Sequence, residues 1–210
     1  MVQMIPNLKT SRTELVDISK AWLALSFAFA LVYSGIFLVG GKPFTLIFTY
    51  PFLQTLLIAF GTAGIGFLLH ELAHKFVAQH YGCVAEFRAF PLMLYLAVGL
   101  ALLIGFIFAA PGAVMISGMI TRKENGIISM AGPGTNFVLS LIFLGLSILF
   151  PPWRYIFATG FSINAWLGLF NMIPFGNFDG VKIFYWNKTI WGIMVVLGIV
   201  LTFILPSSIA

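Results

Sequence analysis

Long apolar stretches fill most of this chain, and they restrict its fold more than any other feature. A helix of about 20 apolar residues crosses the hydrocarbon core of a bilayer. Backbone groups there have no water to bond, so apolar segments cross as helices. The sequence therefore predicts an all-α polytopic membrane protein with about six transmembrane helices. The apolar stretches are residues 21–39, 52–81, 92–110, 127–150, 155–173 and 191–205.

The composition supports this class and argues against others. Hydrophobic residues make up 60% of the chain and charged residues only 8%, whereas a soluble domain has about 25% charged residues. The net charge of +5 comes without a basic cluster, so we expect no nucleic-acid partner. We expect one integral-membrane domain over 1–210 in contact with the lipid bilayer, with a catalytic core over about 52–185. Residues 1–20 precede the first apolar stretch and are expected to be amphipathic or disordered.

Positive charges predict how the chain crosses the membrane. Suppose that 92–110 is re-entrant, rising as a helix and returning as an extended, β-like segment over 111–119. Nine Lys and Arg residues then share one side and two lie opposite, whereas a full crossing gives six against five. The larger asymmetry is favoured, with the N-terminus and the opening of the site cytoplasmic. The nine are Lys9, Arg12, Lys20, Lys75, Arg88, Arg122, Lys123, Lys182 and Lys188, and the two are Lys42 and Arg154.

A metal-binding motif lies inside the second apolar stretch. His70-Glu71-Leu72-Ala73-His74 is an HExxH sequence, which on a helix places two imidazoles one turn apart on the same face. Such a pair can share a zinc ion, and the glutamate between them can act as a general base toward water. Ionisable groups at membrane depth are costly and are functional by default. The motif therefore predicts metal-assisted hydrolysis within the bilayer.

A catalytic zinc usually takes three protein ligands, so the two histidines need a partner. His80 follows His74 by six residues and points away from the shared face of a continuous helix. Asp179 borders an apolar stretch, and the nine-to-two topology brings it to the same membrane side as the histidines. We expect one Zn²⁺ per chain, held by His70, His74 and Asp179. The alternative for Asp179 is a turn residue, since Asp-Gly is a common turn dipeptide.

Three ordered motifs resemble the site-2 protease family of intramembrane zinc metalloproteases. They are HExxH at 70–74, a Gly-Pro-x-x-Asn element ending at Asn136, and NxxPxxxxDG from Asn171 to Gly180. The resemblance implies a zinc metalloendopeptidase with Glu71 as catalytic base, six helices, and single-pass transmembrane proteins as substrates. It would be a minimal form without PDZ or CBS modules. Residues 82–126 are longer and more apolar than the compact β-hairpin of that family.

Several roles stay open in the sequence. Asn136 and Asn171 are candidates for binding the substrate or the oxyanion, and interhelical hydrogen bonding is the alternative for both. Gly132 and Pro133 are expected to shape a helix start, while His80 and Cys83 are expected to be structural. A non-catalytic metal-binding membrane protein, a transporter, and a metal-dependent lipid hydrolase are the competing functions.

Overall fold

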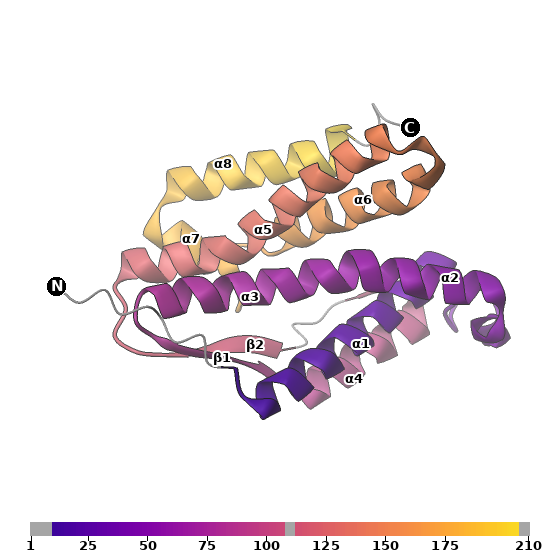
Figure 1. The fold of residues 1–210 in the computed structure, drawn as a ribbon, viewed down its shortest axis with the longest axis horizontal. Coiled ribbons are helices and arrows are strands. Elements are labelled where there is room, and N and C mark those ends of the chain that lie inside the picture. The colour runs from indigo at the N-terminus through magenta and orange to yellow at the C-terminus, as the bar shows by residue number, and fades with distance from the viewer. Residues whose placement is uncertain (1–9, 108–111, 206–210) are drawn as a thin grey trace. The chain divides into compact units, whose positions relative to one another are not determined.

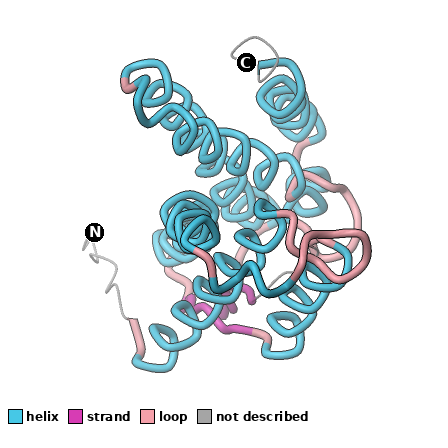
Figure 2. The backbone as a smooth tube through the Cα atoms, turned by 90° about the vertical axis from the view of Figure 1, so that its right-hand side faces the viewer, coloured by secondary structure: helices cyan, strands magenta, loops and turns pink. Residues whose placement is uncertain are grey.

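The computed structural model describes residues 10–107 and 112–205, and helices dominate it (Figures 1 and 2). Lys9, the end of the 92–110 stretch and Pro111 lie outside the described residues. The helices are α1 (Arg12–Ser34), α2 (Tyr50–Ala59), α3 (Ile65–His80), α4 (Pro91–Ile104), α5 (Arg122–Leu149), α6 (Arg154–Phe170), α7 (Asp179–Trp186) and α8 (Lys188–Ile199). The strands are β1 (Val84–Ala89) and β2 (Gly112–Ser117). One π-helical turn, Phe60–Gly64, joins α2 to α3, and another, Val200–Ile204, extends α8.

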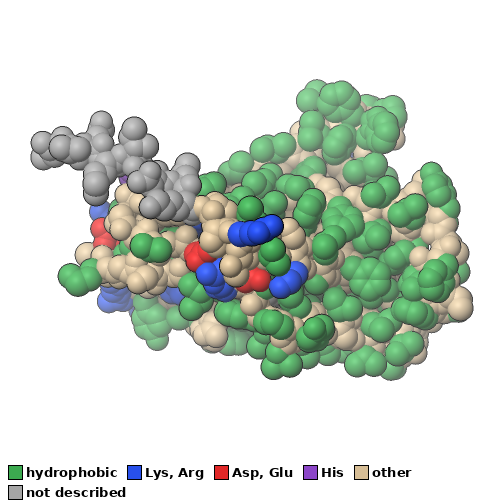
Figure 3. All heavy atoms as spheres, turned by 60° about the horizontal axis from the view of Figure 1, so that its bottom comes forward, with side chains coloured by type: hydrophobic (Ala, Val, Ile, Leu, Met, Phe, Trp, Pro, Cys, Tyr) green, Lys and Arg blue, Asp and Glu red, His purple; other side chains and the backbone are tan. Residues whose placement is uncertain are grey.

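Three helical segments are long and apolar enough to cross a membrane: Arg12–Ser34, Tyr50–His80 and Arg122–Leu149. The chain is thus a mostly helical membrane protein, as its composition predicts. On the face drawn in Figure 3, hydrophobic side chains cover much of the surface and the charged ones gather in a limited area. Pro91–Ile104 and Lys188–Ile204 are shorter apolar helices, so the count of six spans stays a prediction.

Local capping groups explain why several helices differ from the apolar stretches. Helix α1 begins at Arg12, so the last part of the expected amphipathic or disordered lead-in is helical. It ends where Gly35 adopts a left-handed φ of 68°, a conformation that glycine takes readily. Helix α5 begins at Arg122, before the expected residue 127, because Thr121 and Glu124 form a capping box.

Two compact units make up the chain. Unit 1 comprises Met1–Ser11, Leu69–Glu86 and Val114–Ala210, of which residues 1–9 and 206–210 are outside the described part. In it α5 packs against α6 and α7, and α8 packs against α6 and α7 (Figure 1). Its core is formed by Phe137, Phe161, Ala165, Met172, Ile183, Met194 and Leu201. A smaller cluster surrounds Cys83, with Ala78, Ala85 and Ile128.

Unit 2 comprises Arg12–Leu68 and Phe87–Ala113. Helix α1 packs against α2 and α4 in this unit. Gly64 lets α1 approach closely, since a Cβ at that position would overlap the side chains of Trp22 and Ser26. The indole Nε1 of Trp22 also donates to the Phe60 carbonyl across 3.3 Å. The absence of a side chain at Gly64 therefore allows this close contact with α1.

The segment after the HExxH helix contains a small two-stranded sheet of β1 and β2. Gly112 lies against Arg88, and Gly118 lies against Cys83, so the strands run antiparallel. The expected β-like segment is therefore present, although the sequence showed only its second strand. Along the chain, helix α4 connects β1 to β2. It has 14 residues, which is short for a full crossing of the membrane. Whether it is re-entrant stays a prediction.

Candidate metal centre

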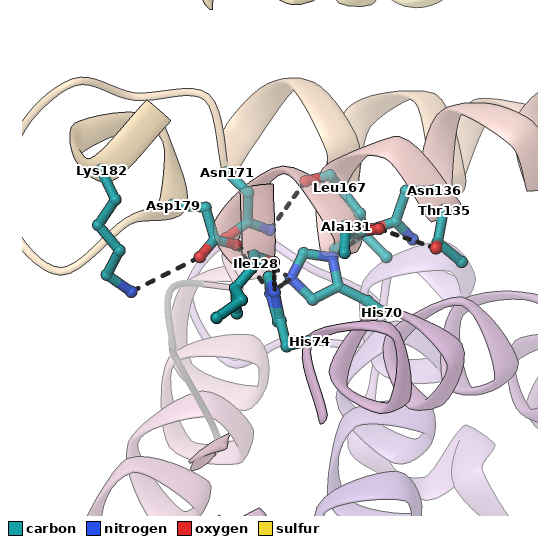
Figure 4. Close-up of polar contacts among 10 residues, drawn as sticks. All are labelled: His70, His74, Ile128, Ala131, Thr135, Asn136, Leu167, Asn171, Asp179 and Lys182. Carbon is teal, nitrogen blue, oxygen red and sulfur yellow. Dashed lines mark hydrogen bonds and ion pairs between the residues drawn. The ribbon is translucent and has the colours of Figure 1, made fainter. Parts of the chain in front are cut away.

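Three side chains from distant parts of the chain converge in unit 1. His70 and His74 lie one turn apart on α3, and Asp179 is the first residue of α7 (Figure 4). The two imidazole Nε2 atoms are 3.1 Å apart. Oδ2 of Asp179 lies 3.3 Å from Nε2 of His70 and 3.1 Å from that of His74. All three residues are buried, and they form the one group with metal-ligand geometry among the described residues.

The spacing of these three atoms fits a tetrahedral zinc ion. Zinc holds histidine nitrogens and carboxylate oxygens at about 2.0–2.2 Å, which places neighbouring ligand atoms roughly 3.3–3.5 Å apart. The observed separations of 3.1, 3.1 and 3.3 Å are close to that value. Two imidazoles and one carboxylate, with a fourth position left for water or substrate, form a donor set typical of catalytic zinc.

Hydrogen bonds on the far side of each imidazole orient the histidines. Nδ1 of His70 lies 2.6 Å from Oδ1 of Asn136, and Nδ1 of His74 lies 2.8 Å from the Ile128 carbonyl. Both partners are acceptors, so each Nδ1 carries the proton. Each Nε2 then keeps its lone pair toward the other ligands, and this is the arrangement of a metal-binding histidine.

Asn136 forms a buried pair of side-chain amides with Asn164. Its side chain is 0% exposed, and its Nδ2 donates to Oδ1 of Asn164 on α6 across 3.1 Å. The candidate role of Asn136 toward substrate or oxyanion stays a prediction, and the structure adds a contact with His70. Asn164 lies outside the three sequence motifs and was not predicted to belong to the site. The available signal was a polar amide within the apolar stretch 155–173, where such groups form interhelical hydrogen bonds.

Gly132 and Pro133 do not start a helix, contrary to the expectation, because they lie inside α5. A Cβ at position 132 would overlap the Nε2 atoms of both His70 and His74. Glycine therefore leaves the room that the imidazoles occupy. Pro133 lacks the N–H that would bond to the Ser129 carbonyl one turn earlier, and the neighbouring Ile128 carbonyl accepts from His74.

The segment before α7 brings Asp179 to the histidines. The backbone N–H of Gly180 donates to the Asn171 carbonyl across 2.7 Å. A Cβ on Gly180 would overlap the Met172 carbonyl, so this glycine is needed for close backbone approach. Asn171 itself bonds within its own helix, from Nδ2 to the Leu167 carbonyl at 2.9 Å. The structure thus gives Asn171 a structural contact, and its candidate role toward substrate stays a prediction.

The second carboxylate oxygen of Asp179 faces a cation. Nζ of Lys182, one turn further along α7, lies 3.7 Å from Oδ1 (Figure 4). The Lys182 side chain is 44% exposed, so water weakens this ion pair. The lysine thus lies beside Oδ1, whereas Oδ2 is the oxygen that faces both imidazoles.

Glu71 follows His70 on α3 and is half-buried. Its carboxylate makes no hydrogen bond or ion pair with any residue in 10–107 or 112–205. The alternative pairing with Lys75 is not formed, since Lys75 is buried and donates from Nζ to Oγ1 of Thr10 at 3.1 Å. A carboxylate with free acceptor oxygens beside a metal site can accept a proton from water.

The other two residues weighed in the sequence lie outside this group. His80 is exposed at the end of α3, where its ring meets Tyr81 edge-on at 5.7 Å. Cys83 is buried in the small apolar cluster with Ala78 and Ile128. Neither side chain reaches the three ligand atoms, and both pack against neighbouring apolar or aromatic groups.

Comparison with known proteins adds two relatives. The chain is 39% identical over 192 residues to "Putative zinc metalloprotease MJ0611" of Methanocaldococcus jannaschii, covering 88% of this chain and 90% of the relative. It is 33% identical over 129 residues to "Putative zinc metalloprotease Rip2" of Mycolicibacterium smegmatis, covering 53% of this chain and 50% of that relative. No family model matches the chain, and no solved structure matches it.

Proposed function

The chain belongs to the family of the relative named "Putative zinc metalloprotease MJ0611", and we propose that it is an intramembrane zinc metalloprotease of the site-2 protease type. It hydrolyses peptide bonds within transmembrane segments of single-pass proteins. The observation that carries the proposal is that Asp179 meets His70 and His74, which lie with Glu71 on a helical segment long and apolar enough to cross a membrane. A lone HExxH motif would support the proposal less strongly, because it would lack the third ligand and the apolar setting that restrict the possible chemistry.

His70, His74 and Asp179 would hold the zinc ion through Nε2, Nε2 and Oδ2. When bound there, zinc polarises a carbonyl group and makes water more acidic. Asn136 and the Ile128 carbonyl hold the imidazoles in the required orientation. Lys182 forms an ion pair with Oδ1 of Asp179.

Glu71 moves the proton during hydrolysis. One of its carboxylate oxygens accepts a proton from the attacking water while the new C–O bond forms at the scissile carbonyl carbon. Glu71 then gives that proton to the leaving amine nitrogen as the C–N bond breaks. Its carboxylate is free for this task, since it has no hydrogen bond or ion pair to lose within the described residues.

The substrate must present an unwound peptide. A transmembrane helix keeps its peptide groups in i→i−4 hydrogen bonds, so it must open locally before hydrolysis. Strand β2 pairs with β1, and no further strand among the described residues pairs with it. We place the unwound substrate beside the extended segment 112–118 by strand addition. Replacing Met115, which is 55% exposed, by proline should then reduce cleavage, whereas Met115→Leu should not. Equal cleavage by the two variants would remove strand addition from the mechanism.

The proposed location follows from the charge count. We propose an integral protein of the cell membrane, forming one domain over 1–210 with its N-terminus and active-site opening on the cytoplasmic side. Cysteine labelling from each side of sealed vesicles tests this orientation. His80→Cys in a Cys83→Ser background gives an exposed reporter near the site. Labelling from the outer side alone would show that the topology is the reverse of the proposed one.

Zinc content and cleavage of a single-pass substrate, measured together in detergent, test the central proposal. Wild type should contain about one zinc per chain and should cut the substrate. Glu71→Gln should keep the zinc and lose roughly 10²–10⁴-fold in cleavage. Glu86→Gln is the matched control, because Glu86 lies on β1 and bonds Ser11 rather than the metal group.

The outcomes separate the competing functions. Zinc in both proteins with cleavage only in the wild type supports the protease. Hydrolysis of lipid but not of peptide would assign the site to a lipid hydrolase. Zinc in both with no hydrolysis of either substrate would favour a metal-binding membrane protein or a transporter. Absence of zinc from the wild type would sink the proposal.

A further inference from the structure

We propose that Asn164 is a positioning residue that fixes the metal-binding orientation of His70, acting through Asn136. Asn164 lies on α6, outside all three sequence motifs and outside contact with the ligand atoms. The inference rests on the proposed metal site, and it extends that site from α3, α5 and α7 to a fourth helix, α6. It names a residue whose loss should weaken zinc binding although it does not touch the metal.

A continuous chain of hydrogen bonds links α3, α5 and α6 within unit 1. Nδ1 of His70 donates to Oδ1 of Asn136 at 2.6 Å. Nδ2 of Asn136 donates to Oδ1 of Asn164 at 3.1 Å. Nδ2 of Asn164 donates to the Gly160 carbonyl at 2.9 Å. Both asparagines are 0% exposed, so water cannot replace any partner in this chain.

The direction of this series of hydrogen bonds is set at its α6 end, by the Gly160 carbonyl. A side-chain amide has a donor end and an acceptor end of nearly the same shape, so it can turn over in place. A backbone carbonyl can only accept. The Gly160 carbonyl therefore requires the amino group of Asn164, and this turns Oδ1 of Asn164 toward Asn136. That oxygen requires the amino group of Asn136, and Oδ1 of Asn136 then faces His70.

The direction decides which nitrogen of His70 can bind a metal. An acceptor at Nδ1 keeps the proton there and leaves the lone pair on Nε2, which faces His74 and Asp179. A reversed Asn136 would present its amino group to Nδ1. The proton would then sit on Nε2, and His70 would have no lone pair for the metal. Asn164 prevents that reversal by occupying the amino group of Asn136.

A purely structural role for Asn164 makes a different prediction, and the chain offers a matched control. Ser140 lies one helical turn after Asn136 on α5 and is also 0% exposed. Its hydroxyl donates to the Phe161 carbonyl of α6 at 3.1 Å. Ser140→Ala thus removes a buried hydrogen bond from the same helix pair without touching the amide chain.

The test is the zinc affinity of purified, metal-stripped protein, measured by competition with a chelating dye. Asn164→Leu should lower the affinity roughly 10–100-fold, whereas Ser140→Ala should leave it within about twofold of wild type, because its hydrogen bond lies outside the orienting shell. The visible absorption spectrum of the cobalt-substituted protein should change in Asn164→Leu only, since that spectrum reports the ligands and their geometry.

A double-mutant cycle tests whether Asn164 acts through Asn136. Once Asn136 is replaced by leucine, adding Asn164→Leu should change the affinity by less than about twofold, because coupled residues are not additive. Additive losses would overturn the proposal, as would equal affinities of Asn164→Leu and Ser140→Ala. Asn164→Ala removes the same groups without added bulk and replaces the leucine variant if that one does not fold.

Failure of this inference is distinguishable from failure of the proposed function. His70→Ala should abolish tight zinc binding whatever the role of Asn164. If wild type binds zinc no better than His70→Ala, the metal site itself is wrong. If wild type binds tightly and Asn164→Leu binds equally well, only the positioning role is wrong.

Discussion

Units 1 and 2 are both built from apolar helices, but the metal-ligand group lies in unit 1, where buried side-chain hydrogen bonds tie it to other helices. In unit 1, side chains of different helices bond to one another, as His70, Asn136 and Asn164 do. In unit 2, the buried side chains of Thr62 and Glu14 bond to backbone groups. The Thr62 hydroxyl donates to the Ile58 carbonyl at 2.6 Å, and Glu14 accepts from the N–H of Phe87 at 3.0 Å.

This difference distinguishes the unit that holds the metal-ligand group from the unit that does not. A hydrogen bond to the backbone satisfies one buried polar side chain. The side chains that pack around it can still be replaced by others of similar shape. A side-chain network ties several helices to a single arrangement, and each member matters to the rest. We therefore expect substitutions in unit 1 to change metal binding and those in unit 2 to change stability.

The largest expected effect is removal of a ligand. His74→Ala leaves two of the three ligand side chains, so zinc should fall from about one per chain to below roughly one tenth, and cleavage should disappear. His80→Ala is the matched control, because His80 is exposed and lies outside the metal group. Metal analysis of both proteins checks this. Zinc loss from the His80 variant would mean that the ligand set is assigned wrongly.

A smaller effect is expected from filling the space beside the imidazoles. Gly132→Ala adds a methyl group where both Nε2 atoms lie, and zinc affinity should fall roughly 10–100-fold, as it does when a histidine loses its orientation. Gly134→Ala, on the same helix, meets nothing within 4 Å and should bind zinc like wild type. Competition with a chelating dye measures both. Similar affinities of the two variants would contradict the close packing of α5 on the histidines.

The corresponding change in unit 2 should act on stability alone. Gly64→Ala would push against Trp22 and Ser26, costing about 1–3 kcal/mol of unfolding free energy through overpacking. Gly61→Ala meets nothing within 4 Å and should stay within about 1 kcal/mol of wild type. Denaturant unfolding in detergent measures the loss, and zinc affinity should be equal in all three proteins. A fall in zinc affinity for Gly64→Ala would break the contrast between the units.

The smallest effect is expected at the edge of the site. Lys182→Met removes the cation facing Oδ1 of Asp179, but an exposed ion pair is worth only about 0–1 kcal/mol. Zinc affinity should therefore fall by no more than about fivefold, and the difference should shrink at high salt. The control is Lys188→Met, because the ammonium of Lys188 lies over the Phe184 ring, 5.2 Å from its centroid. A loss as large as that of Gly132→Ala would show that Lys182 orients Asp179 more tightly than its exposure implies.

Much of the fold could be predicted because its signal is local. The length of each apolar stretch, together with the lack of water in a bilayer, predicts helices. The observed Tyr50–His80 segment closely follows the predicted 52–81. The limits of α1 and α5 were harder to predict, because capping groups such as Thr121 and Gly35 outweigh hydropathy at helix ends. Strand β1 was missed, although residues 85–89 alternate apolar and polar side chains, which was the available signal for a half-buried strand.

The HExxH spacing alone places His70 and His74 on one helix face, because residues four apart on an α-helix are neighbours. It also marked Glu71 and Asp179 as acids in or beside apolar segments. Only the tertiary structure placed Asp179 at 3.1–3.3 Å from both imidazoles. It alone revealed Asn164 and the space kept by Gly132. Such contacts join segments far apart in the chain, and local periodicity carries no information about which helices meet or at what depth.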